Sequence, residues 1–249
     1  MKEELLKKID DNKKTFELGK KKLKDNNEEV QNYFKSMLTY SVNALAGSEL
    51  TLDETKEVIE KGELIKGKSI RDYYIAEGFA QTFDYFSKSY KKAFTEASIK
   101  RLHTKLYGKI NDKKGGKYRD LQVYLSDFKY MPPSGEDVPE LMKHFIGQIQ
   151  CSENILHPVE FAVMCHRRVL EMQPFWDGNI QIALIITNMI LLKEGYGYLV
   201  ISPDKKDEYY DAFIKSQNKE KTDIDTMINL MAECLIESQE MTLKVAGIQ

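Results

Sequence analysis

The residues from about 179 to 193 constrain the fold more than any other part of this chain. They read NIQIALIITNMILLK, and apolar residues fall on nearly every side of a helix of this sequence. A helix that is apolar all round is buried, either in the core of a protein or in a membrane. The apolar run Ile182–Leu192 is shorter than the roughly 20 residues that a membrane span requires. We therefore expect a central helix covered by other helices.

Most of the remaining chain also has apolar residues at helical spacing. Thr51 and Glu54 have the spacing of a capping box, and Gly62 favours the end of the helix that they would begin. A chain of 249 residues is long enough to bury a large core without disulfides. Besides the helix after Thr51 and the central one, helices are predicted over residues 2–40, 70–89, 96–108, 137–150, 158–170, 204–216 and 222–245.

One segment predicts strands instead of a helix. Residues 117–131, KYRDLQVYLSDFKYM, are rich in Tyr, Val, Leu and Phe, and apolar residues alternate with polar ones around Leu121, Val123 and Leu125. Ser126 and Asp127 make a plausible turn, and Pro132 and Pro133 would end the second strand. The predicted fold class is therefore mainly α, with one β-hairpin inserted.

The composition of the chain indicates which kinds of partner and which cellular compartment to expect. Lys and Arg number 37 against 39 Asp and Glu, so the whole chain does not have the charge of a nucleic-acid-binding protein. Three cysteines without a pairing pattern indicate reduced thiols, and the charged N-terminus has no apolar signal core. We expect a cytoplasmic protein with no nucleic-acid or membrane partner.

Residues 62–69, GELIKGKS, match the phosphate-binding pattern GxxxxGK[ST]. That chemistry needs a strand leading into the loop, so that backbone N–H groups and the next helix converge on the phosphates. Here a charged helical segment comes before it. We interpret the match as a connection between two helices.

The segment Gln173–Asn179, QPFWDGN, carries the chemistry of interest. Asp177 offers a hard oxygen ligand for Mg²⁺, and Gly178 permits a turn that a Cβ would obstruct. Gly178, Asn179 and the first turn of the next helix are able to direct N–H groups at phosphate oxygens. On spacing alone, a tight turn between two helices with Asn179 as the cap explains the same residues better.

The segment resembles the signature HPFxxGNGRxxR of the Fic (Fic/Doc) family, whose members mostly transfer AMP from ATP to hydroxyl side chains of target proteins. The resemblance implies a Fic-like helical bundle with a hairpin flap at 117–133 and a motif loop at 173–184. It divides the chain into N-terminal helices (1–95), a Fic core (96–215) and a C-terminal helix (216–249). Similar stretches run in family order over roughly residues 40–215: Gly67–Asp72, Ile99–His103, Gly116–Arg119, Tyr130–Pro133, His157–His166, Ile201–Ser202 and Tyr209–Tyr210.

Family roles carry over only where this sequence keeps the motif. The resemblance implies ATP and Mg²⁺ as cofactors, with Asp177 as the metal ligand. It also implies a protein partner in the groove beside the flap, and an oligomer is compatible with it. The implied nucleotide-binding positions are Phe175, Asp177, Gly178, Asn179 and Gln181, and the implied target-binding positions of the flap are Val123, Tyr124 and Leu125.

Several family positions are changed in this chain. Gln173 replaces the histidine that takes a proton from the attacking hydroxyl, and an amide is no base near neutral pH. Ile180 replaces a glycine, while Gln181 and Leu184 replace the two arginines that hold phosphate oxygens. Ala46 stands where many members have an inhibitory glutamate, so we expect an apolar pair of Ala46 and Leu184 in place of an ion pair.

Three functions fit this pattern. The leading hypothesis is a degenerate Fic protein that has lost ordinary AMP transfer and acts as a binding or regulatory module. The second is an active transferase with altered chemistry, in which Gln173 orients a hydroxyl and Arg119 or the pair Lys205–Lys206 replaces the phosphate clamp. The third is a nucleotide sensor without turnover. The sequence leaves open whether the chain is an enzyme.

Overall fold

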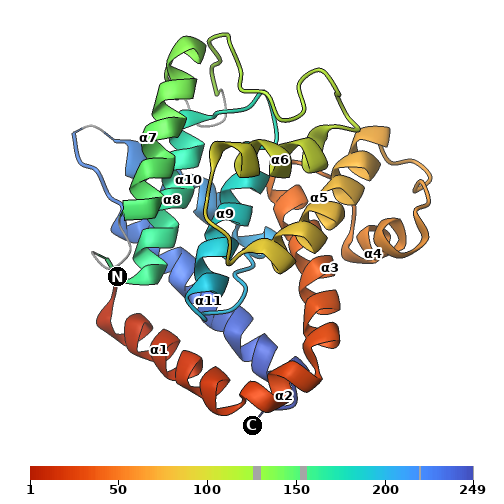
Figure 1. Cartoon of the computed structure of the whole chain (residues 1–249), viewed down its shortest axis with the longest axis vertical. Helices are drawn as coiled ribbons and strands as arrows, with labels where there is room; N and C mark the ends of the chain where they lie inside the picture. Colours follow the sequence, from red (N-terminus) through yellow and green to blue (C-terminus); the bar gives the residue numbers. More distant parts are fainter. Residues whose placement is uncertain (126–129, 152–155, 219, 249) are drawn as a thin grey trace.

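The computed structural model describes all residues except 126–129, 152–155, 219 and 249 (Figure 1). The described chain is mainly helical. Its α-helices are α1 (Glu3–Leu18), α2 (Lys20–Asp25), α3 (Asn27–Leu45), α4 (Leu52–Lys61), α5 (Ile70–Ser89), α6 (Glu96–Tyr107), α7 (Val138–Cys151), α8 (Pro158–Met172), α9 (Asn179–Lys193), α10 (Lys206–Gln217) and α11 (Asp225–Val245), with short 3₁₀ turns at Gly135–Asp137 and Pro203–Lys205.

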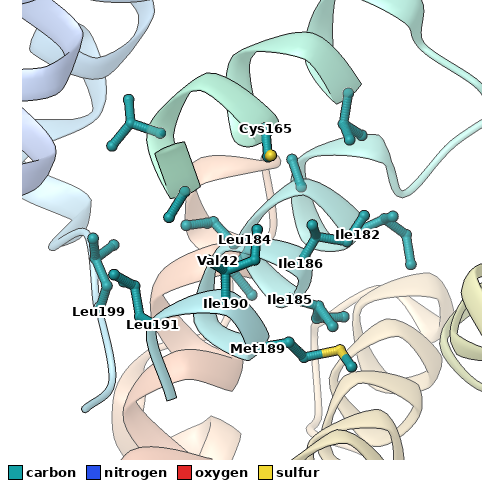
Figure 2. Close-up of a cluster of buried hydrophobic side chains, with 14 of the residues drawn as sticks. Val42, Cys165, Ile182, Leu184, Ile185, Ile186, Met189, Ile190, Leu191 and Leu199 are labelled. Carbon is teal, nitrogen blue, oxygen red and sulfur yellow. The ribbon is translucent and has the colours of Figure 1, made fainter. Parts of the chain in front are cut away.

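Helix α9 is the centre of the fold, as its all-round apolar sequence predicts. Every side chain from Gln181 to Leu191 is buried. Helix α9 packs against α8, α3, α5 and α6, so neighbours cover it on several sides (Figure 1). Figure 2 shows Val42 of α3 and Cys165 of α8 among the apolar side chains of α9. Among the described residues, no helix is long and apolar enough to cross a membrane.

Local signals set the boundaries of α4 and α5 as predicted. Thr51 and Glu54 form a capping box at the start of α4, and Gly62 ends the helix in the left-handed conformation at φ 67°. Ser69 caps α5 by accepting a hydrogen bond from the Asp72 N–H. The segment that matches the phosphate-loop pattern is therefore the connection between α4 and α5, and a helix rather than a strand precedes it.

The predicted helical region at residues 2–40 is divided into α1, α2 and the first part of α3, with breaks at Gly19 and Asn26. Helix α1 packs along α11, with Met1 near Asp225 at the start of α11 and Lys22 near Gly247 after its end, so the two termini lie at opposite ends of this helix pair (Figure 1). One hydrophobic cluster includes residues from each of the three parts into which the family resemblance divides the chain, 1–95, 96–215 and 216–249. Examples are Ile9, Val163 and Met231.

The flap segment, residues 117–133, contains little regular strand. Leu125 and Tyr130 form one antiparallel bridge, with N···O distances of 2.9 and 3.2 Å, around residues that include the predicted turn at Ser126 and Asp127. Those two residues lie outside the described part of the chain. Among the described residues of the flap segment, no strand pairing extends beyond this bridge. Residues 118 and 119 pair with the motif loop instead, and Tyr118 bridges Phe175.

Candidate functional site

The motif loop begins where α8 ends in an unusual backbone conformation. Gln173 closes α8 at φ 45° and ψ 61°, and its N–H donates to the Val169 carbonyl. It is the one non-glycine residue with positive φ in the described chain. Glycine or asparagine normally occupies such a helix-terminating position, because a Cβ is strained there. Gly178, at φ 75°, turns the chain into α9.

Asn179 holds the loop together from the first residue of α9. Its Oδ1 accepts from the Phe175 N–H at 2.9 Å, and its Nδ2 donates to the Phe175 carbonyl at 2.9 Å. The same Nδ2 donates to Gln173 Oε1 at 2.9 Å, while Gln173 Nε2 donates to the Leu170 carbonyl at 2.8 Å. Both ends of the buried Gln173 amide are thus bonded within the loop. Asn179 is not the helix cap that the turn interpretation predicted, since Gly178 holds that place.

His103 of α6 packs against the motif loop. Its ring stacks on Phe175 with centroids 3.8 Å apart, and Phe175 is buried in the core. His103 Nδ1 accepts from the Gly116 N–H at 2.9 Å, so the ring proton lies on Nε2 and is donated to the Asp177 carbonyl at 3.0 Å. Burial lowers the pKa of His103 to about 4. Its sequence position, 74 residues from Asp177, gave no sign of this contact.

Asp177 is engaged by a cation of the protein itself. Its Oδ2 accepts from Arg71 Nη2 of α5 at 2.7 Å, and its Oδ1 accepts from the Gly178 N–H at 2.7 Å. Partial burial on its own lowers the pKa of Arg71. The hydrogen bond and the negative charge of Asp177 together have a larger effect, so the net result is a raised pKa. Among the described residues there is no cluster of three His, Cys, Asp or Glu side chains that could hold a metal. This arrangement does not fit a metal ion while Arg71 stays in place.

Residues 93–191 match the family model described as the Fic/DOC family. The chain carries a Fic/DOC domain. The matched range includes the flap, α8, the motif loop and most of α9.

Relatives and solved structures agree with this assignment. The protein adenylyltransferase Fic of Nematostella vectensis is 28% identical over 237 residues, which are 93% of this chain and 54% of that protein. A Fic-domain signalling protein of Bacteroides thetaiotaomicron has the same fold, with a TM-score of 0.83, 24% identity, and coverage of 97% of this chain and 98% of that one. IbpAFic2 in complex with adenylylated Cdc42 is a more distant match of fold, with a TM-score of 0.52, 19% identity, and coverage of 86% and 70%. The chain spans about half the length of the curated relatives, 54% of the first and 43% of the second.

Gln181 and Leu184, where the family resemblance implies arginines, are buried residues of α9. Gln181 Nε2 donates to Asn43 Oδ1 of α3 at 3.2 Å, and the Asn43 Nδ2 has no partner among the described residues. Leu184 is 1% exposed and lies near Val42 in the apolar cluster of Figure 2. Ala46 is half-buried directly after α3. The polar link between α3 and α9 is therefore an amide pair.

Arg119 binds the flap to the motif loop, which argues against the hypothesis that it replaces the phosphate clamp. Its buried guanidinium donates to four carbonyls, and its backbone N–H donates to the Pro174 carbonyl at 3.0 Å. The alternative lysines are also engaged: Lys205 pairs with Glu237 at 2.7 Å, and Lys206 donates to the Ala44 carbonyl at 3.3 Å. The four carbonyls that Arg119 binds belong to Leu121 (2.8 Å), Pro133 (2.6 Å), Met172 (3.1 Å) and Gln173 (2.7 Å).

His166, seven residues before Gln173, is a packed residue of α8. It is fully buried, with Nε2 at 2.7 Å from the Tyr209 hydroxyl and Nδ1 at 3.2 Å from Thr187 Oγ1. The Thr187 hydroxyl donates to the Ala183 carbonyl, so Nδ1 carries the ring proton and Nε2 accepts from Tyr209. Burial lowers the pKa of His166 to about 3. It offers no free base to the loop.

Proposed function

We propose that this Fic domain has lost histidine-dependent AMP transfer and acts as a module that binds a protein. One observation carries the proposal: the position of the signature histidine holds Gln173, whose amide is bonded at both ends within the loop. An amide accepts no proton near neutral pH. Absence of a positioned general base typically costs about 10²–10⁴ in rate.

Neither neighbouring histidine supports a substitute base. Both ring nitrogens of His103 form hydrogen bonds, with the Gly116 N–H and the Asp177 carbonyl. Both ring nitrogens of buried His166 also form hydrogen bonds, with the hydroxyls of Thr187 and Tyr209. Both histidines have pKa values well below neutral, so they are uncharged and poor proton acceptors at pH 7. This argues against a transferase in which another histidine of this core replaces the lost base.

Nucleotide binding without turnover is the second candidate, because the first turn of α9 has no side-chain cap. A helix N-terminus with free N–H groups attracts phosphate. The curated relatives are adenylyltransferases, which favours ATP as the nucleotide. Phe175, Gly178, Asn179 and Gln181 would line its phosphates. Asp177 would hold Mg²⁺ only after it releases Arg71.

A transfer assay tests the loss of activity. We expect no AMP adduct on the chain or on lysate proteins after incubation with ATP and Mg²⁺, measured by mass spectrometry. Gln173→His is the matched variant, and we expect it to stay inactive because Gln181 and Leu184 still lack the phosphate clamp. An adduct made by the unaltered chain would refute the loss of transfer. Calorimetric titration with ATP, run in parallel, separates a nucleotide sensor from a scaffold that binds none.

The flap is the proposed surface for the protein partner. Leu121, Tyr124 and Met131 expose 60–62% of their surface, although large apolar side chains are usually covered. Val123 and Leu125 lie beside them, half-buried in an extended segment that a partner strand is able to join. The fold neighbour in complex with adenylylated Cdc42 shows that a Fic domain accommodates a folded protein.

Charging the flap tests this surface. Tyr124→Asp is expected to abolish cross-linking to the cellular partner that the unaltered chain captures, because a carboxylate opposes apolar contact. Leu18→Asp is the matched control, since Leu18 is 89% exposed on α1, outside the flap. Equal capture by the two variants and the unaltered chain would exclude the flap as the docking surface.

A further inference from the structure

A cavity of about 380 Å³ lies where α5 passes into α6, outside the motif loop. Its wall runs from Tyr85 and Ser89 at the end of α5, through the turn that follows, to Arg101 and Leu102 of α6, and Met189 of α9 also lines it. Ligand sites for small molecules are commonly about 300–1,000 Å³. The cavity is therefore large enough for a small organic ligand.

The charge around this cavity is strongly positive. In a chain with a net charge of −2, the stretch 88–105 contains six Lys or Arg residues and one acid, Glu96, which is already paired with Lys100 at 2.6 Å. Two of the cations, Lys92 and Arg101, line the cavity, and no carboxylate does. Within the described chain, neither side chain forms an ion pair or a hydrogen bond, and both side chains are exposed, which leaves both charges available.

Arg101 is held against an aromatic ring. The guanidinium carbon of Arg101 lies 5.9 Å from the centre of the Tyr85 ring, and Lys105 Nζ lies 5.4 Å from it. A cation–π contact involves the charge of the guanidinium and leaves its N–H groups available for hydrogen bonds. The exposed Arg101 therefore keeps its N–H donors for a ligand at the cavity wall.

A hydroxyl at the start of α6 adds another donor. The Ser89 and Ser98 hydroxyls donate to the carbonyls of Tyr85 and Thr95. Thr95 Oγ1, by contrast, only accepts, from the Ser98 N–H at 3.1 Å, so its proton is free to bind a ligand. Tyr85, Leu102 and Met189 provide apolar surface beside these donors.

We propose that this cavity binds a small phosphorylated molecule. Lys92, Arg101 and the Thr95 hydroxyl would hold the phosphoryl oxygens, and the ring of Tyr85 and the side chain of Met189 would contact the organic part. A phosphoryl group matches the wall, because it offers several acceptor oxygens and two negative charges to donors that have no other partner. The site is distinct from the motif loop, although α6 joins them: Arg101 lines the cavity and His103 contacts the Asp177 carbonyl.

The test is titration of the full chain with pyrophosphate and with glucose 6-phosphate at physiological salt, followed by calorimetry and amide chemical shifts. We expect saturable binding that shifts the amides of Thr95 and Arg101. The double variant Lys92→Gln, Arg101→Gln should weaken it about tenfold or more, because it removes both charged donors from the cavity wall. A second double variant, Lys88→Gln with Lys91→Gln, changes the net charge equally outside the cavity, and we expect it to bind within about twofold of the unaltered chain.

Three results would overturn the proposal. One is no binding of either probe at millimolar concentration. Another is an equal loss in both double variants, which would indicate a diffuse basic surface. The third is tight binding of single-stranded RNA or anionic vesicles without saturable binding of the small probes. If a probe shifts the amide signals of motif-loop residues only, it binds at the proposed nucleotide site instead of the cavity. That result would also contradict the cavity proposal.

Discussion

Replacing Arg119 with Met is expected to lower the free energy of unfolding by about 3–5 kcal/mol, because buried hydrogen-bond acceptors lose their donor. The guanidinium is 1% exposed and satisfies carbonyls on both sides of the flap and at the end of α8. Methionine fills similar space and donates nothing. Urea denaturation followed by circular dichroism measures the change.

Two further variants show whether geometry or charge matters at this position. Arg119→Lys keeps the charge but lacks the planar fork, so we expect it to recover only part of the loss. Arg168→Met removes an arginine that is half-buried on α8 and paired with Glu171, and it should cost less than about 1 kcal/mol. A cost below that value for Arg119→Met would show that the four carbonyls find other partners.

Leu184→Arg, which restores an arginine of the Fic signature, is expected to destabilise the chain by about 3–5 kcal/mol, because it buries an unpaired charge. Leu184 lies within the apolar side chains of α9, and Ala46 offers no carboxylate (Figure 2). Thermal and urea denaturation should both show the loss.

Leu184→Met is the matched control and should cost less than about 1.5 kcal/mol, since it keeps volume and polarity. The double variant Leu184→Arg, Ala46→Glu should recover part of the stability if position 46 faces position 184 as the family resemblance implies. A Leu184→Arg chain as stable as the unaltered one would mean that the position reaches water.

The sequence predicted the features that depend on neighbouring residues. The all-round apolar pattern identified α9 as the buried centre, and the Thr51–Glu54 spacing identified the cap of α4. The charged helix before Gly62 was enough to reject the phosphate-loop match. These signals operate within one or two helical turns, so the chain order alone contains them.

The features that depend on contacts between distant segments were not predictable from local patterns. The pairing of Arg71 with Asp177 joins residues 106 positions apart, and Arg119 reaches Gln173 across 54. The structure of the flap also depends on a contact with a distant segment. Its alternating sequence predicted two strands, but strand formation also needs a partner edge, and Tyr118 pairs with Phe175 of the motif loop instead.

The hold of Arg119 on Leu121 and Pro133 also affects how tightly a partner can bind the flap. The guanidinium keeps these two carbonyls together, so the fold has already met the entropic cost of bringing the two ends of the flap to one place. For the proposed partner, less interaction energy is then lost to ordering these ends. Weakening the guanidinium contact should therefore reduce affinity at the flap although Arg119 itself is buried.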